Sequence, residues 1–94
     1  MYMLKVSYGY VDEPDMATTD ILGTYETWDE AAEVAENKFS SILDGFGRGT
    51  YLCPEISQGH QYNYRVEDDD GRIVESGLVF SGPDYYCQVA VIEI

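Results

Sequence analysis

Apolar and polar residues alternate over the first ten positions of the chain. Because successive side chains of a β-strand point to opposite faces, this period of two predicts a strand with one apolar face. The residues on that face are Tyr2, Leu4, Val6, Tyr8 and Tyr10. An acidic, turn-forming stretch follows at residues 11–15, and a second short strand is predicted over residues 21–26. The two strands are expected to form a hairpin.

The strongest local signal predicts a helix that begins after Thr27. Thr27 is suited to the N-cap, and Glu30, three residues later, completes a capping box that satisfies free backbone N–H groups. A helical period then runs from Trp28 to about Leu43. It places on one face Trp28, Ala31, Ala32, Ala35, Phe39, Ile42 and Leu43. Gly45 is expected to end the helix.

Three further strands are predicted after the helix. Residues 44–61 hold several glycines and are expected to be irregular, with a short strand around residues 51–53. The later strands are predicted over residues 62–67, 72–80 and 85–94. An Asp-Gly turn signal at Asp70 joins the first two of these, and the last is apolar on both faces, which favours a central place in the sheet. The predicted fold is α+β: a single helix packed on a mainly antiparallel sheet of about five strands, in the order β-β-α-β-β-β.

The chain is short and strongly acidic. Its 94 residues are enough for one domain with one core. Eighteen carboxylates against five bases give a net charge of −13, whereas a magnitude of about 2–8 is usual for a small domain. Nucleic acids and anionic membranes bind basic surfaces, so we expect no direct binding to either. The charge favours a basic protein partner, with solubility or a salt-adapted host as the alternative explanation.

The sequence contains no recognisable signal peptide or membrane-spanning segment. The first residues lack the signal-peptide pattern, and no window approaches the roughly 20 apolar residues of a membrane span. A cytoplasmic protein is therefore expected. Cys53 and Cys87 do not form a Cys-x-x-Cys motif and are interpreted as buried thiols, with a single bridge between them left open.

Two groups of carboxylates are the candidate partner-binding residues. Four of them share an arc of about 120° on the predicted helix, opposite its apolar face: Asp29, Glu30, Glu33 and Glu36. Like charges three or four residues apart cost about 0.2–0.5 kcal/mol per pair. This group is either a solvated face or an anionic ridge that is spaced like nucleic-acid phosphates. The second group lies at the predicted hairpin tip and consists of Glu67, Asp68, Asp69 and Asp70.

The sequence holds no recognised catalytic or metal-binding pattern. The acidic hairpin tip fails the EF-hand pattern, because its glycine and glutamate do not occupy the required sixth and twelfth positions. Residues 45–49 are rich in glycine but follow a helix, whereas phosphate-binding loops precede one. Cys53 and His60 are the only thiol–imidazole candidates, and both lie in the glycine-rich segment. We therefore expect no enzyme activity, no cofactor and no bound metal.

Nine tyrosines are many for a chain of 94 residues. We expect Tyr2, Tyr62 and Tyr64 to pack in the core or under the helix. Five others lie near predicted strand ends or in loops, where some can be exposed: Tyr8, Tyr10, Tyr51, Tyr85 and Tyr86. Exposed tyrosines beside carboxylates suit a protein interface, because they add contact area at low entropic cost. Ordinary strand preference explains them equally well.

These observations lead to two hypotheses about function. The first is an inhibitor or decoy that mimics nucleic acid and occupies a basic site on a nuclease or another nucleic-acid-handling protein. In size, charge and lack of catalytic motifs, the chain resembles the small acidic anti-restriction and anti-CRISPR proteins of phages and plasmids. The alternative is a non-catalytic adaptor or accessory subunit that binds through a sheet edge and exposed tyrosines. A homodimer is compatible with both.

Overall fold

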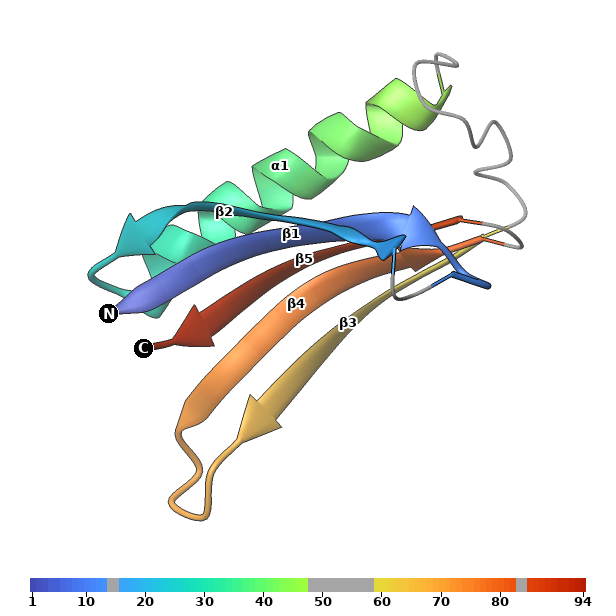
Figure 1. Cartoon of the computed structure of the whole chain (residues 1–94). Helices are drawn as coiled ribbons and strands as arrows, with labels where there is room; N and C mark the ends of the chain where they lie inside the picture. The colour runs from blue at the N-terminus through green and yellow to red at the C-terminus, as the bar shows by residue number, and fades with distance from the viewer. Residues whose placement is uncertain (14–15, 48–58, 83–84) are drawn as a thin grey trace.

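One helix and five strands make up the described part of the chain (Figure 1). The computed structural model describes residues 1–13, 16–47, 59–82 and 85–94. The elements are β1 (Tyr2–Tyr10), β2 (Thr18–Tyr25), α1 (Trp28–Gly47), β3 (His60–Glu67), β4 (Ile73–Ser81) and β5 (Tyr85–Glu93). The predicted α+β fold and its element order are confirmed. The expected strand at residues 51–53 lies outside the described residues.

The strands form one antiparallel sheet in the order β2-β1-β5-β4-β3. The last strand, β5, is central, as its apolar residues on both faces predicted. Its Val91 pairs with Leu4 of β1 on one side and with Ser76 of β4 on the other. The edges are β2, whose register shifts near its Leu22, and β3.

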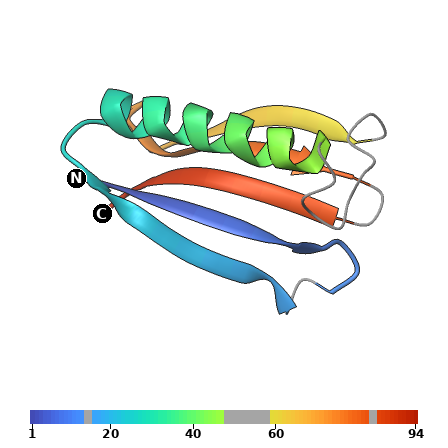
Figure 2. The same cartoon turned by 90° about the horizontal axis from the view of Figure 1, so that it is seen from above.

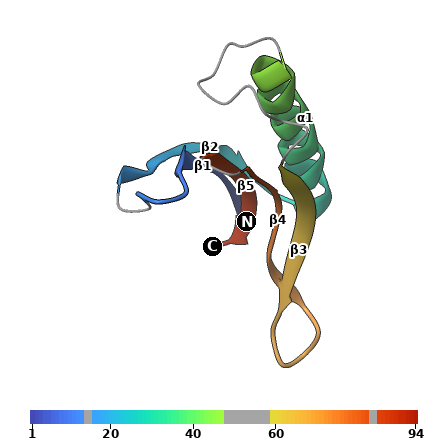
Figure 3. The same cartoon turned by 90° about the vertical axis from the view of Figure 1, so that its right-hand side faces the viewer.

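Helix α1 covers one face of this sheet and runs lengthwise along it (Figure 2). Its predicted apolar face supplies Ala31, Ala35, Phe39 and Ile42 to the core. The largest fully buried side chains of the sheet are Phe80, Leu4, Val89, Val91 and Cys87. Among the described residues, α1 packs on β5, β4, β1 and β2, whereas no Cα atom of α1 lies within 8 Å of a Cα atom of β3. The sheet bends away from the helix, so its other face is concave, and no described helix or strand covers that face (Figure 3). We call this second face the open face.

The helix begins where the sequence predicts but ends later. The backbone N–H of Glu30 donates to Thr27 Oγ1 over 3.2 Å, which confirms Thr27 as the N-cap. The expected end at Gly45 is wrong, because α1 continues to Gly47. A glycine ends a helix when it adopts a positive φ, and Gly45 keeps a helical backbone. Without that cap, the glycine only lowers the helix propensity, by about 1 kcal/mol.

The predicted Asp-Gly turn between β3 and β4 is confirmed. Gly71 has a φ of +82°, a left-handed conformation that favours glycine. Asp68 Oδ1 accepts hydrogen bonds from the backbone N–H groups of Asp70 and Arg72, both over 2.9 Å. Arg72 also forms an ion pair of 2.7 Å with Glu93 at the end of β5. The turn therefore fixes the hairpin register with its own side chains.

Two tyrosines that were expected in the core lie on the open face instead. Tyr62 and Tyr64 pair with Val79 and Gly77 of β4, and Tyr62 is 54% exposed. The prediction was wrong because the register with β4 places the other alternate set of β3 residues, which includes Arg65, on the side of the helix, so the two tyrosines face away from it. Of the five tyrosines placed near strand ends or in loops, where some could be exposed, Tyr85 is 7% exposed and belongs to the core.

Candidate functional site

The four predicted carboxylates of α1 are all exposed on the outer arc of the helix, and we call them the acidic ridge: Asp29, Glu30, Glu33 and Glu36. The opposite face of this helix is buried in the core, so the ridge is presented on a fixed support. Glu36 lies at the side of the arc that borders the cleft between α1 and β3. No ion pair is found for any ridge carboxylate among the described residues. The ridge is therefore free to accept cations.

The second predicted group, the hairpin tip, is also exposed but lies apart from the ridge: Glu67, Asp68, Asp69 and Asp70. The tip projects beyond the helix (Figure 1). Trp28 at the start of α1 is hydrogen-bonded to Ser76, and β4 extends three residues from there to its first residue, Ile73, which is about 10 Å along the strand before the turn begins. Asp68 is occupied by the turn, so Glu67, Asp69 and Asp70 are the residues of this group that can bind a partner without disturbing the turn.

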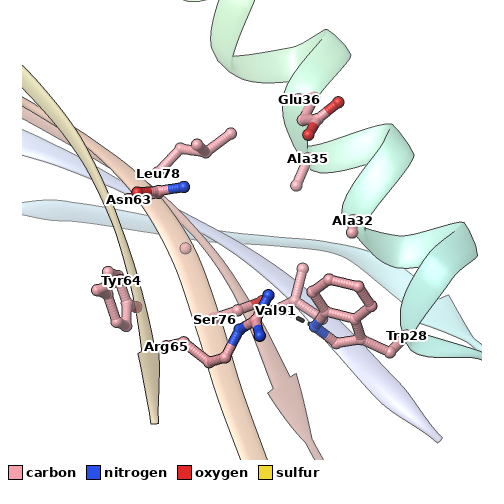
Figure 4. A pocket seen from close by; sticks show the side chains of 11 residues that line it. Trp28, Ala32, Ala35, Glu36, Asn63, Tyr64, Arg65, Ser76, Leu78 and Val91 are labelled. Carbon is pink, nitrogen blue, oxygen red and sulfur yellow. Dashed lines mark hydrogen bonds between the residues drawn. The ribbon is translucent and has the colours of Figure 1, made fainter. Parts of the chain in front are cut away.

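A cleft of about 400 Å³ separates the two acidic groups, between α1 and β3 (Figure 4). At one end, Trp28 Nε1 donates a hydrogen bond of 2.8 Å to Ser76 Oγ, the one buried polar side chain of the described core. Arg65 of β3 places its guanidinium carbon 5.8 Å from the centroid of the Trp28 ring, a cation–π contact. The contact holds β3 to the helix where their backbones do not meet. It also puts a positive charge between the ridge and the tip.

The open face carries a second cavity, of about 460 Å³, that the sequence did not predict. We call it the tyrosine cavity. Its lining residues come from β3, β4, β5 and the turn after β1: Val11, Tyr62, Tyr64, Glu75, Val79, Ser81, Tyr86 and Gln88. Tyr62 and Val11 are exposed at its rim, whereas Val79 is buried. Because α1 lies on the opposite side, nothing among the described residues covers this cavity.

A hydrogen-bonded network of three side chains crosses the tyrosine cavity. The Tyr64 hydroxyl donates to Glu75 Oε2 over 2.6 Å and accepts from Gln88 Nε2 over 2.7 Å. Tyr64 spans β4 to reach β5, and this requires a glycine at the crossing point. A Cβ at Gly77 would lie 2.5 Å from the Tyr64 ring, closer than a real contact allows.

The network also keeps Tyr64 protonated. Burial raises the pKa of its hydroxyl, and the hydrogen bond to the Glu75 carboxylate raises it further. Tyr64 therefore remains a donor at physiological pH, and Glu75 is held in place by it. No described base lies within ion-pair distance of Glu75, and none lines the cavity. The carboxylate thus has hydrogen-bonding capacity left over.

The remaining candidates for chemistry stay apart. His60 is exposed at the first residue of β3, and Cys53 lies outside the described residues. Cys87 is a free thiol buried under α1. Within the described ranges, no three His, Cys, Asp or Glu side chains are grouped so that they could hold a metal ion.

Cys87 is expected to resist alkylation in the folded protein. Burial raises the pKa of its thiol from 9.0 to about 11, although Lys38 acts in the opposite direction. At pH 9 only about 1% would be thiolate, the reactive form. Iodoacetamide should therefore modify Cys87 of a Cys53→Ser variant far more slowly than the same chain in denaturant, as mass spectrometry can measure. Equal rates would show that Cys87 is accessible.

The raised pKa of the Cys87 thiol also predicts that the free energy of unfolding falls at alkaline pH. A thiol whose folded pKa is raised contributes stability that is fully present below its unfolded pKa and lost as the pH rises through the folded value. For Cys87 this window runs from about pH 9 to about pH 11. A Cys87→Ala variant should show a smaller fall in the free energy of unfolding across this window.

The part of the chain that the structure describes has no helix with the length and apolarity that crossing a membrane requires. Comparison of the chain with protein-family models, with curated proteins and with solved structures finds no match.

Proposed function

We propose that this chain is a non-catalytic binding protein that occupies a basic, nucleic-acid-binding surface of another protein. The observation that supports the proposal is the acidic ridge: four exposed carboxylates on the outer arc of a helix whose other face is buried in the core. A flexible acidic tail could be attracted to the same partner, but it would lose more conformational entropy on binding. The helix removes much of that cost.

The mechanism is displacement. Neighbouring ridge carboxylates three or four residues apart stand about 5–6 Å from one another at their Cβ atoms, a spacing close to that of phosphates along a nucleic-acid strand. Lysine and arginine side chains that normally hold phosphates pair with these carboxylates, so the nucleic acid is excluded. Close charge pairs at an interface couple by about 1.5 kcal/mol or more and speed association. The exposed carboxylates of Asp69 and Asp70 extend the acidic surface beyond the ridge.

A competition experiment tests this function. Extract from cells that make the protein is passed over immobilised duplex DNA, and the purified chain is added at constant ionic strength. It should release a subset of the DNA-bound proteins. A ridge variant, Glu30→Lys with Glu33→Lys and Glu36→Lys, should release at least about tenfold less at the same concentration, because several charge pairs become repulsive.

A charge-matched variant provides the control. Asp12→Lys, Glu13→Lys and Asp20→Lys change three exposed carboxylates at the β1–β2 end of the molecule and also bring the net charge from −13 to −7, since each change adds two positive charges. If the ridge variant and the control release the same amount of protein from the DNA, the net charge alone accounts for the release. The ridge is then only a solvated face. Asp68 is left unchanged in all variants because it builds the hairpin turn.

A second function, that of an adaptor, is supported by edge strand β3. Its residues from His60 to Val66 include no carboxylate, although the chain has eighteen. Tyr62 and Val66 are 54% and 46% exposed on this strand. An uncovered edge can accept a strand from a partner through backbone hydrogen bonds. Such a complex should withstand added salt, whereas a complex held by the ridge should dissociate as salt screens its charges.

A further inference from the structure

The tyrosine cavity combines the three features that recognise a cationic side chain. Tyr62, Tyr64 and Tyr86 supply aromatic rings, and ring faces attract cations. Glu75 supplies a carboxylate without an ion-pair partner among the described residues. Gln88 uses its Nε2 to donate to Tyr64, which leaves its carbonyl oxygen as an acceptor. All of these groups border one uncovered space of about 460 Å³.

We propose that this cavity receives the guanidinium group of an arginine side chain. The inference rests on the proposed function, because the arginine is taken to belong to the basic partner. Binding in the cavity would give that partner a second contact, on the face of the sheet opposite the ridge. A guanidinium is planar, stacks on tyrosine and presents several donors at once, so it matches rings, carboxylate and amide oxygen together. A lysine ammonium can satisfy the carboxylate but stacks less well.

The network prepares the cavity for this ligand. The Tyr64 hydroxyl donates a hydrogen bond to Glu75 Oε2 and so orients the carboxylate, while Oε1 remains available to a guanidinium N–H. Gly77 allows Tyr64 to lie across β4 and form one wall. An arginine here would not meet a competing charge, since the cavity lining contains no base. An anion would face Glu75, and an apolar group would leave its carboxylate unused.

Nuclear magnetic resonance with a small probe tests the site on the whole chain. N-acetyl-arginine methylamide is titrated into the protein, with the matching citrulline compound as a neutral isostere and the norleucine compound as an apolar one. A single side chain should bind with a Kd on the order of 1–10 mM. The arginine compound should shift the signals of Tyr62, Tyr64, Tyr86 and Gln88, and the other two should not.

Two variants assign the binding to the cavity. Glu75→Gln should weaken arginine binding by about tenfold, because it removes the charge but keeps the shape. Tyr62→Ala should weaken it by about threefold, and the variant should stay folded because the Tyr62 side chain is exposed. Asp20→Asn, which removes one exposed carboxylate on β2, should leave the affinity unchanged.

Three results would overturn the inference. Equal shifts with norleucine would assign the cavity to an apolar segment, and concentration-dependent shifts of its signals without any probe would assign it to a second copy of the chain. Shifts confined to the ridge would show charge attraction alone. The outcome is separable from the proposed function: if the chain releases proteins from DNA but arginine does not bind the cavity, only this inference fails. If arginine binds but nothing is released, the decoy fails and the cavity stands.

Discussion

A Phe80→Ala variant is expected to lose about 3–5 kcal/mol of the free energy of unfolding. Phe80 is fully buried, on the face of β4 beneath α1, and it packs in the core with Leu4, Val89 and Ile42. Removing the ring leaves a cavity that the β-sheet cannot close by moving. A domain of this size has a total stability of roughly 5–14 kcal/mol, so the variant should be close to unfolding at room temperature.

The neighbouring residue provides the control for this effect. Val79 is buried too, but it points to the open face, where it forms the floor of the tyrosine cavity. Val79→Ala should cost about 1–2 kcal/mol, because it removes fewer atoms and the enlarged space can fill with water. Urea unfolding followed by circular dichroism measures both values. If the two variants were equally destabilised, the open face would have to be covered by something that packs as tightly as α1.

The folded chain should become more stable as the ionic strength rises from about 0.01 M to about 1 M, over which the Debye length falls from about 30 Å to about 3 Å. A net charge of −13 is more concentrated in the folded state than in the unfolded state, so self-repulsion favours unfolding until salt screens it. The free energy of unfolding, measured in urea at several sodium chloride concentrations, gives the effect. Chloride is preferable to sulfate here, because sulfate stabilises proteins independently of charge.

The two variants with a net charge of −7 make this prediction specific. Repulsion grows with the square of the charge, so their salt effect should fall to about 0.3 of the parent's. The ridge variant and its charge-matched control should show the same salt effect, although they are expected to differ in releasing proteins from DNA. A parent chain that is unfolded at low salt would support the salt-adapted host as the reason for the acidity. A parent chain that stays folded at low salt would instead favour partner binding as the reason for the acidity.

Local signals were sufficient to predict most of the fold. The capping box at Thr27 and the apolar face from Trp28 onward predicted the helix, because backbone capping and amphipathic period depend on near neighbours in the sequence. The Asp-Gly turn and the apolar character of β5 predicted the second hairpin and the centre of the sheet. The exposure of all eight predicted carboxylates is also consistent with the sequence analysis, since charged side chains are rarely buried unless paired.

The tyrosine cavity was missed because it depends on which way an edge strand faces. A period of two shows that Tyr62 and Tyr64 share a face, but it does not show which face the helix covers. One signal could have revealed the network: counting back from the turn at Gly71 pairs Tyr64 with Gly77, and a glycine opposite a tyrosine suggests a ring lying across the strand. The hydrogen bonds of Tyr64 with Glu75 and Gln88 could not be predicted without the order of the strands in the sheet.

The central position of β5 decides how the chain can fold. The β1–β2 and β3–β4 hairpins are formed by residues close in sequence, but β5 brings Val91 to Leu4, at opposite ends of the 94-residue chain. The β1–β2 hairpin and the β3–β4 hairpin become parts of one sheet only when that closure occurs. A high average sequence separation between contacting residues slows two-state folding, to milliseconds or seconds. The nucleus should therefore contain β5 with β1, and mutations at their shared border should slow folding more than they speed unfolding.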